Sequence, residues 1–474
     1  MSIFGLVLLL LVAVLVPLTG LPSFLILLFA AAVGAVAGVL SDTIPAALLA
    51  ALPIRVVNLL ENDLLQALPL YVLMGALMNR LPIADAIFQT SLRMMPGRAA
   101  APAVAAMGMG ALLGPMNGSV GASIVALSRS VASRLRSSGM SPPGIHALIA
   151  VASTFGIVVP PSLVLILLGD AMMGAHTIAL NVSHRSDQVI NTQDLFRGAL
   201  LPAALFLLGC VVVAFLDRGS APSTVARPSS PGRGAALIAM IYVAFVIGLL
   251  VGVASGRFYA VEGAAAGAFV LFVTCAVSGR LSNGALRELL RETMTTTGVL
   301  FMLLVAATTF TLVFRLLGSD RLLDEWISNA PFDPQLLTAI VLLAIALAGL
   351  ALDAFEIIFV LVPILMPPLL TRVPDATWVA VMLLLALQAS FLLPPVGYAL
   401  LMVRGVLREH VDSVALARRV APFLFVQLLV LVLVLGFPRL VHFGKPEVSA
   451  KPVPMTDEEV RRKMQDMLPR AAPN

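Results

Sequence analysis

The stretch Gly114-Pro-Met-Asn-Gly-Ser-Val-Gly-Ala-Ser123 interrupts a long apolar tract. Three glycines and a proline within ten residues do not sustain a regular helix, and irregular backbone at membrane depth is tolerated only where protein buries it or where it lines a wet cavity. Asn117, Ser119 and Ser123 bring side-chain oxygens to the same place. With freed carbonyl oxygens, they are hard ligands of the kind that a small cation such as Na⁺ needs. The stretch therefore predicts the ion and substrate site of a transporter, and the alternative is a small-residue helix-packing motif.

The composition of the chain indicates a membrane protein. Of its 474 residues, 60% are hydrophobic and only 12% are charged, and the mean hydropathy is +1.03. This balance excludes a soluble domain and predicts a polytopic helical protein with about a dozen membrane segments. The net charge of +5 comes mostly from loop arginines, which indicate positive-inside anchoring and no nucleic-acid surface. Cys210 and Cys275 lie in apolar runs and indicate neither a disulfide framework nor a metal site. The apolar N-terminus is expected to be a retained first span.

Other features of the first half depart from simple spanning helices. Residues 58–80 are apolar but short and bounded by polar residues, which predicts a re-entrant hairpin. The apolar run 145–169 contains Thr154 and then Pro160-Pro161-Ser162, and two adjacent prolines leave nearby carbonyls without donors. A segment rich in proline, serine and glycine, 217–234, predicts a polar linker near the middle of the chain.

The second half follows the same plan. Pro394-Pro395 repeats the Pro160-Pro161 pair at an offset of 234 residues (394 minus 160). At that offset the first hairpin falls on the Thr-rich run 292–314, and 114–123 falls on 348–357, which holds two carboxylates. Paired interruptions in two halves are the best sequence pointer to the site of a repeat transporter. We therefore predict an all-α polytopic membrane protein with two structural repeats, which we expect to be inverted. Its expected parts are repeats at 1–216 and 235–444, hairpins at about 58–80 and 292–316, broken helices at about 99–133 and 335–370, the linker 217–234, and a soluble tail at 445–474.

Candidate ion- and substrate-binding residues lie at these interruptions. They are Gly114, Asn117, Gly118, Ser119, Ser123, Thr154, Pro160, Pro161, Ser162, Thr308, Thr309, Asp353, Glu356, Ser390, Pro394, Pro395, Gly397 and Arg404. Asn117, Ser119 and Asp353 are the expected Na⁺ ligands. No catalytic residue is expected.

Several of these residues have a second interpretation. Asp353 and Glu356 are intramembrane carboxylates and are therefore functional candidates. The alternative is that they form structural ion pairs with Arg315 or Arg404. The threonines of 293–311 are alternatively bonded to their own helix. Arg404 is the best arginine candidate for a substrate carboxylate, and the alternatives are an interfacial anchor or a partner for Glu356.

The motifs resemble those of a known family over about Ile3 to Phe437. The chain resembles the large membrane subunit of tripartite ATP-independent periplasmic (TRAP) transporters, the DctM-type permease. The segment Leu352-Asp-Ala-Phe-Glu-Ile357, with 310–317 before it, is similar to the branch associated with 2-oxo acids, lactate and similar organic acids. The motifs that carry the resemblance are Pro69-Leu-Tyr-Val-Leu-Met-Gly75, Gly114–Ala122, Gly156-Ile-Val-Val-Pro-Pro-Ser162, Glu262-Gly-Ala-Ala-Ala266, Leu352-Asp353, Leu393-Pro-Pro-Val-Gly397 and Arg404-Gly405.

The resemblance implies an elevator-type secondary transporter of the bacterial inner membrane. Na⁺ entry as the coupling ion would drive symport of a small organic acid, such as a 2-oxo acid, lactate or a dicarboxylate, delivered by a periplasmic binding protein. A small four-helix membrane subunit on a separate chain, membrane lipid and the organic acid are the expected partners, with no enzymatic activity and no cofactor.

Two departures from the family motifs affect the expected ion ligands. The family's Gly-x-x-Ser-Gly-Ser-Ser here carries Asn117 and Val120 in place of two serines, and Leu393 replaces a threonine. Ser390 is the candidate to replace the lost hydroxyl. Proton coupling through Glu356 is the alternative to Na⁺.

Two other functions compete with this one. A stand-alone carboxylate symporter of related fold would need no binding protein. An intramembrane enzyme could use Asp353 and Glu356 as a carboxylate pair, but no nucleophile motif, metal cluster or cofactor site accompanies them.

Overall fold

The computed structural model describes residues 2–61, 63–81, 83–95, 98–117, 119–160, 162–185, 188–216 and 233–443. Gly118, Pro161, all but the last two residues of the expected linker, and the expected tail lie outside these residues. The described part is helical and contains no strand. Eight of its helices are long and apolar enough to cross a membrane, which confirms the predicted all-α polytopic class.

The first half contains eleven α-helices and two short turns among the described residues. They are α1 (Ser2–Thr19), α2 (Ser23–Leu40), α3 (Ala46–Leu49), α4 (Leu52–Leu60), η1 (Asp63–Gln66), α5 (Ala67–Met78), α6 (Ile83–Met94), α7 (Ala101–Leu113), η2 (Pro115–Asn117), α8 (Val120–Ser137), α9 (Pro142–Val158), α10 (Leu163–Ser183) and α11 (Thr192–Leu216).

The second half, as described, holds the remaining helices. They are α12 (Arg233–Ala254), α13 (Ala260–Val277), α14 (Asn283–Leu316), α15 (Ser319–Ser328), α16 (Pro334–Ala348), α17 (Ala354–Glu356), the π-helical turn η3 (Ile357–Leu361), α18 (Val362–Arg372), α19 (Ala376–Phe391), α20 (Tyr398–Leu407), α21 (Ser413–Gly436) and η4 (Pro438–Leu440).

The helix boundaries of the two halves correspond at the offset of 234. Moved by 234, α7 becomes 335–347, and α16 occupies 334–348. Moved likewise, α8 becomes 354–371, where α17, η3 and α18 together occupy 354–372, and α9 becomes 376–392, where α19 occupies 376–391. The elements around the candidate site therefore occur in the same order and with nearly the same lengths in both halves.

The stretch around Gly114 is the tip of a helical hairpin. A Cβ added at Gly110 would lie 2.2 Å from the Ala152 carbonyl oxygen, and one added at Gly114 would lie 2.8 Å from the Gly156 nitrogen. From the first contact to the second, the residue number rises by four in both helices, so α7 and α9 run parallel. Only 138–141 connects α8 to α9, and these two helices pack together, so they run antiparallel. It follows that α7 and α8 run in opposite directions, and we call them hairpin 1.

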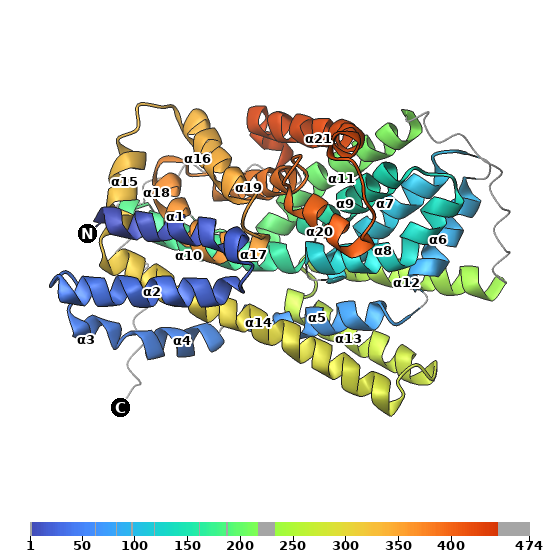
Figure 1. The fold of residues 1–474 in the computed structure, drawn as a ribbon, viewed down its shortest axis with the longest axis horizontal. Helices are drawn as coiled ribbons and strands as arrows, with labels where there is room; N and C mark the ends of the chain where they lie inside the picture. The colour runs from blue at the N-terminus through green and yellow to red at the C-terminus, as the bar shows by residue number, and fades with distance from the viewer. Residues whose placement is uncertain are drawn as a thin grey trace, which may run out of the picture.

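A second hairpin follows from the hydrogen bonds of Arg372, at the end of α18. Its guanidinium donates to the carbonyl oxygens of Ala330 at 2.7 Å and Phe332 at 2.9 Å. Phe332 lies just before α16 begins, so the start of α16 and the end of α18 are side by side. Helix α16 and the segment α17–α18 therefore form hairpin 2, with 349–353 at its tip. Figure 1 places hairpin 1 and hairpin 2 toward opposite ends of the molecule.

These findings correct four expected boundaries. The stretches expected as broken helices, 99–133 and 335–370, are the two hairpins. The stretch 292–316, expected as a hairpin, lies inside the continuous helix α14. Residues 58–80 hold the end of α4, η1 and α5, and both α4 and α5 contact α14 along its length, without folding back on one another (Figure 1).

The reason for these differences is where the chain can turn. No proline interrupts α14, and hydroxyls along it donate to carbonyls one turn back: Thr293 to Leu289, Thr309 to Val305 and Thr311 to Ala307. The run is thus an ordinary helix with threonines bonded to their own backbone. In hairpin 1, packing of both arms against α9 decides that the chain reverses after Gly114 and does not continue.

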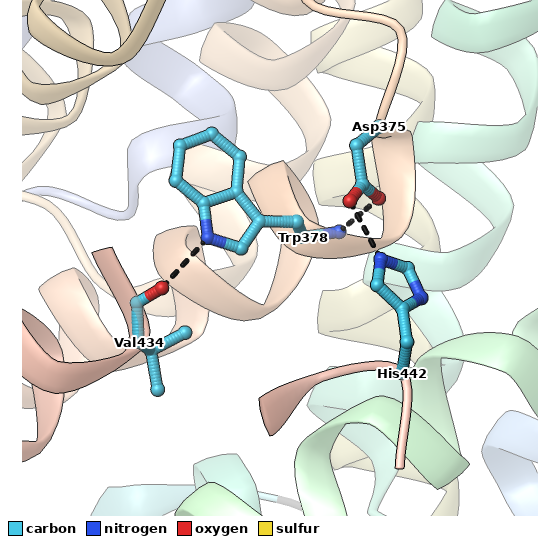
Figure 2. Close-up of polar contacts among 4 residues, drawn as sticks. All are labelled: Asp375, Trp378, Val434 and His442. Atoms are coloured by element: carbon cyan, nitrogen blue, oxygen red, sulfur yellow. Dashed lines mark hydrogen bonds and ion pairs between the residues drawn. The ribbon is translucent and has the colours of Figure 1, made fainter. Parts of the chain in front are cut away.

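One end of α19 is fastened to the end of α21 (Figure 2). Asp375 caps α19 by accepting a hydrogen bond from the Trp378 backbone at 2.9 Å, and its other oxygen lies 2.6 Å from His442 Nε2. The Trp378 indole donates to the Val434 carbonyl at 2.9 Å. These bonds join the first turn of α19 to both the last turn of α21 and the segment after it.

Candidate functional site

Each hairpin tip packs on a helix that is itself interrupted by prolines. In the first half Gly114 contacts Gly156, which lies four residues before Pro160 in the break between α9 and α10. In the second half a Cβ at Gly349 would lie 2.5 Å from Ser390 Oγ, and Ser390 lies four residues before Pro394 in the break between α19 and α20. The structure therefore brings the predicted residues Gly114 and Ser390 close to the Pro-Pro segment of their own half.

The two halves also touch one another at this place. Gln388 Nε2 donates to Thr154 Oγ1 at 3.2 Å, and both side chains are fully buried. The predicted site residue Thr154 thus meets the residue that stands 234 positions later. The other amide atom, Gln388 Oε1, is buried without a protein partner. Gln388 was missed as a site residue, although the offset to Thr154 was a signal for it.

Three of the predicted oxygens cap helices that start at the interruptions. Ser119 Oγ accepts from the Ala122 backbone at 3.1 Å and begins α8, and Ser162 Oγ accepts from the Leu165 backbone at 3.1 Å and begins α10. Asp353 Oδ1 accepts from the backbones of Phe355 and Glu356 at 2.8 and 3.1 Å and begins α17. An N-cap orients its oxygen toward the positive end of the helix. These side chains therefore lie at the helix ends that a bound ion would meet.

Asn117 has a donor with no partner. The residue is 8% exposed, and its amide Nδ2 is buried without a hydrogen bond in the described structure. Helix α5 closes over this turn, because a Cβ at Gly75 would lie 2.6 Å from the Met116 carbonyl oxygen and 3.0 Å from Asn117 Cα. A buried polar group without a partner is costly and calls for a ligand or water. Asn117 offers that ligand an amide donor and an amide oxygen.

Asp353 and Glu356 form a reciprocal capping box. Glu356 Oε2 accepts from the Asp353 backbone at 3.1 Å while Asp353 accepts in the other direction, and the Ser23 hydroxyl of α2 hydrogen-bonds to Glu356. The Asp-x-x-Glu spacing is the sequence signal for such a box, which was not predicted. The alternative of an ion pair with Arg315 is wrong, because that side chain donates to the Pro363 carbonyl at 3.1 Å.

Arg404 lies in a separate polar cluster. Its Nη2 donates to Ser413 Oγ at 3.0 Å, and beside it Arg136 forms an ion pair with Glu409. His146 interacts electrostatically with Arg404, Arg136 and Glu409. Because α20 runs from Tyr398 toward this cluster, Arg404 is carried away from the tips. Within the described residues Arg404 forms no ion pair with Glu356, so the alternative that gave it this partner is wrong.

Tyr398, the first residue of α20, was not predicted as a site residue. Its hydroxyl would lie 3.5 Å from a Cβ at Gly121 in hairpin 1, and it also interacts electrostatically with Asp353 and Glu356 in hairpin 2. Its position right after Gly397 was the only signal available in the sequence.

The remaining candidates are less informative. Ser123 and Ser390 donate to carbonyls of their own helices, those of Ser119 and Leu387. Thr309 does the same, and Thr308 lies half-buried beside it on α14. Pro394-Pro395 is a cis peptide, and a Cβ at Gly397 would lie 2.5 Å from the Phe391 carbonyl oxygen. The last contact requires glycine there. The two candidates Gly118 and Pro161 lie outside the described residues.

The donor set around the tips fits a hard cation and a carboxylate. Amide, hydroxyl and carboxylate oxygens come from Asn117, Ser119 and Asp353, and an unpaired amide N–H comes from Asn117. Within the described residues no group of three or more His, Cys, Asp or Glu side chains is arranged to hold a metal ion. The arrangement offers oxygen ligands and hydrogen-bond donors at interrupted helices.

A family model and individual relatives of known proteins point to the same family. Residues 5–440 match the sequence model of the "Tripartite ATP-independent periplasmic transporter, DctM component" family. The chain is 25% identical over 386 residues to the sialic acid TRAP transporter large permease protein SiaM of Vibrio cholerae, which covers 80% of this chain and 86% of that protein. It is 22% identical over 395 residues to the 2,3-diketo-L-gulonate TRAP transporter large permease protein YiaN of Escherichia coli, with 81% and 87% covered.

A solved structure has a similar fold. The crystal structure of the Alcanivorax borkumensis YdaH transporter, described as having an unusual topology, aligns with a TM-score of 0.59. The match covers 84% of this chain and 88% of that one, at 16% sequence identity. This likeness concerns the fold alone.

Proposed function

The chain belongs to the DctM component family of tripartite ATP-independent periplasmic transporters, and we propose that it couples Na⁺ entry to the uptake of a small organic acid. As a large permease component it is a transporter and not an enzyme, it lies in the bacterial inner membrane, and it works with a small membrane subunit and a periplasmic binding protein. The coupling ion, the acid and the mechanism are the proposed parts.

The observation that carries the proposal is the meeting of two hairpin tips with two proline-interrupted helices. Gly114 contacts Gly156, Gly349 contacts Ser390, and Thr154 bonds to Gln388 across the halves. Such interruptions free backbone groups for ligands at a depth where water is scarce. They support one shared site between the halves.

The charges at the helix starts support separate positions for the substrate anion and the cation within the site. In the first half the starts of α8 and α10 are capped by neutral serines, which leaves the positive ends of these helices available to an anion. In the second half the start of α17 carries two carboxylates, which favour a cation. The substrate carboxylate then binds at Asn117 and the first-half helix starts, and Na⁺ binds on the Asp353 side.

The names of two relatives support the proposed substrate class. The named substrates of SiaM and YiaN are sialic acid and 2,3-diketo-L-gulonate, and both are carboxylic acids. We propose a small carboxylate with a 2-oxo or hydroxy group, in keeping with the family branch that Leu352–Ile357 resembles. No lysine lies between Met1 and Phe443, so helix starts, amides and arginines have to meet its charge.

For the movement we propose an elevator in which the hairpins travel with α9, α10, α19 and α20. The glycine contacts between α7 and α9 join hairpin 1 closely to α9. On the other side, α14 contacts α2 and α5, and α5 contacts α13, which supports a second body of long helices (Figure 1). The halves then act as two inverted repeats.

Reconstitution tests the proposal. Proteoliposomes that contain this chain and the small membrane subunit are given the binding protein, a radiolabelled acid and an inward Na⁺ gradient. Uptake that requires all three proteins and the Na⁺ gradient is expected. Uptake that ignores Na⁺ and follows a proton gradient overturns Na⁺ coupling, and uptake by this chain alone identifies a stand-alone symporter.

A further inference from the structure

A large cavity lies beside hairpin 1, outside the site described above. Its volume is about 570 Å³, and its walls are the end of α5, one face of α8, and the first part of α14. In Figure 1 these elements lie on the hairpin 1 side of the molecule. The proposed site does not use any of the charged side chains that line it.

The cavity leads from the tip of hairpin 1 toward the end of α8. Its wall on α8 runs from Ala122 to Ser130, which is a distance of about 12 Å along the helix axis. Ala122 is the residue whose backbone N–H is capped by Ser119. The inner end of the cavity therefore reaches the candidate site, and it is apolar there, with Ala76 and Leu113 among its walls.

The outer part of the cavity is charged. Arg80 and Arg129 line it, and within the described residues neither guanidinium has a hydrogen bond or an ion pair. Arg280 adds a third positive charge, because its Nη1 donates to the Arg80 carbonyl at 3.0 Å. Glu288 and Glu292 lie one turn apart on α14 in another wall. Two unpaired arginines along a water-accessible route form a place where a passing anion can bind.

The arginines around the base of hairpin 1 place this cavity on the cytoplasmic side. Arg93 and Arg98 precede α7, and Arg134 and Arg136 end α8. Arginine excess in short loops marks the cytoplasmic face. The base of hairpin 2 differs, because acidic Asp320, Asp324, Asp333 and Asp375 accompany Arg321 and Arg372 there.

The cavity at the equivalent place in the second half has no arginine at the positions that correspond to Arg80 and Arg129. A cavity of about 180 Å³ lies beside hairpin 2, and its walls hold Arg315 and Arg321 together with the carboxylates of Asp320 and Asp324. At the offset of 234, Pro363 is the counterpart of Arg129, and Arg315, the counterpart of Leu81, donates to the Pro363 carbonyl at 3.1 Å. The positions equivalent to Arg80 and Arg129 are therefore Phe314 and Pro363, so this arginine pair does not follow from the helix pattern that the halves share.

We propose that the α5–α8–α14 cavity is the cytoplasmic vestibule of the transport site, and that Arg80 and Arg129 form a transient binding site in it for the carboxylate of the leaving substrate. The inference rests on the proposed function. The arginines attract the anion from the tip of hairpin 1 toward the cytoplasm, and the carboxylates of Glu288 and Glu292 in the same cavity repel it and keep that binding weak enough for release.

The charge selectivity of a cysteine placed in the vestibule tests this proposal. Ser130→Cys is made in the full chain with its small subunit, in inside-out membrane vesicles; the native Cys210 and Cys275 are buried. The probes are an anionic and a cationic methanethiosulfonate reagent. We expect Cys modification from the cytoplasmic face, with the anionic-to-cationic rate ratio lowered by about threefold to tenfold in the double variant Arg80→Gln, Arg129→Gln.

Three controls make the result specific. Arg129→Lys should keep the ratio, which guards against loss of folding. Arg291→Gln removes a positive charge from α14 outside the lining and should leave the ratio unchanged. Glu288→Gln with Glu292→Gln should raise it. In the uptake assay, Arg129→Gln should also raise the half-saturating acid concentration for efflux more than for uptake.

The outcomes separate this inference from the proposed function. An unreactive Cys, one reactive only from the periplasmic face, or an unchanged ratio in the double variant overturns the vestibule assignment, and Na⁺-driven uptake of the acid can still be measured. If the charge selectivity is intact but the protein transports no acid, the proposed function is overturned. The anion that passes the arginines is then not the proposed substrate.

Discussion

Gln388 donates a 3.2 Å hydrogen bond to Thr154, and the two residues occupy equivalent positions in the two halves of the chain. When equivalent residues of two repeats touch one another, they lie near the axis that relates the repeats. The contact between α9 and α19 is therefore where the axis of the proposed repeats is expected to pass. A side chain on that axis is close to both hairpin tips.

We predict measurable coupling between these two residues. A double-mutant cycle with Thr154→Val and Gln388→Leu should give a coupling free energy of about 0.6 kcal/mol and at most about 1.7 kcal/mol, the average and the maximum found for side-chain hydrogen bonds within a membrane protein. Unfolding in detergent, followed by intrinsic fluorescence, measures it. Additive single variants would mean that the bond contributes nothing and that the halves are joined elsewhere.

The roles of Asp353 as a cap and as an ion ligand can be separated. Asp353→Ala should destabilise the protein by about 0.5–2 kcal/mol through loss of the α17 cap. Asp353→Asn keeps a capping oxygen and removes the charge, so its unfolding should match the wild type while the Na⁺ concentration for half-maximal uptake rises. If Asn behaves like wild type in both measurements, Asp353 is a cap and no ligand.

Asn117 should show a trade-off between stability and transport. Its amide Nδ2 is buried and unpaired, so Asn117→Ala is expected to keep or raise the melting temperature, because an unsatisfied buried group costs about 1–3 kcal/mol. Uptake should fall sharply in the same variant. A loss of stability together with normal uptake would show that Asn117 is structural.

Close packing of α7 on α9 can be tested with two glycines of one helix. Gly110→Ala places a methyl group 2.2 Å from the Ala152 carbonyl oxygen and should destabilise by about 1–3 kcal/mol. Gly108→Ala is the matched control, because nothing lies within 4 Å of its Cβ. It should be neutral or stabilising by up to about 1 kcal/mol. Equal melting temperatures for the two variants would contradict the close contact between α7 and α9.

Arg404 is expected to act on stability and not on substrate affinity. Arg404→Gln loses the bond to Ser413 and disturbs the neighbouring pair of Arg136 and Glu409, so the melting temperature should fall. The half-saturating acid concentration should stay near the wild-type value, and adding Glu356→Gln should not restore stability. Rescue by that second change would put the two residues in contact after all.

The sequence predicts the places where helices stop better than the direction the chain takes afterwards. Glycine and proline at 114–123 and 394–395 mark interruptions that the structure contains, because these residues act locally on the backbone. Whether the chain reverses at Gly114 depends on contact with Gly156, which lies 42 residues later (156 minus 114). Such contacts leave no local signal, so the two hairpins were expected as broken helices, and hairpins were expected at 58–80 and 292–316, where the described residues form none.

Side-chain roles show the same limit. The carboxylates Asp353 and Glu356 were singled out by type, and their place in the ion and substrate site stays a prediction. Their bonding to one another's backbone follows from cap geometry that a spacing of three only suggests. Arg404 was expected near the site because it follows the proline pair. Helix α20 carries it instead to the end of α8, since each turn advances about 5.4 Å. The threonines of α14 were correctly given a second interpretation as backbone-bonded.

The hydrogen bonds between α19 and the end of α21 couple the movements of these two helices. Trp378 bonds to Val434 and Asp375 to His442, so any stroke of α19 through the bilayer has to drag α21 and the segment up to Phe443 along. A bulky folded domain fused behind Phe443 cannot enter the lipid, and it would therefore act as a brake on that stroke. The rate of transport can thus be controlled by a modification outside the membrane and far from the substrate site.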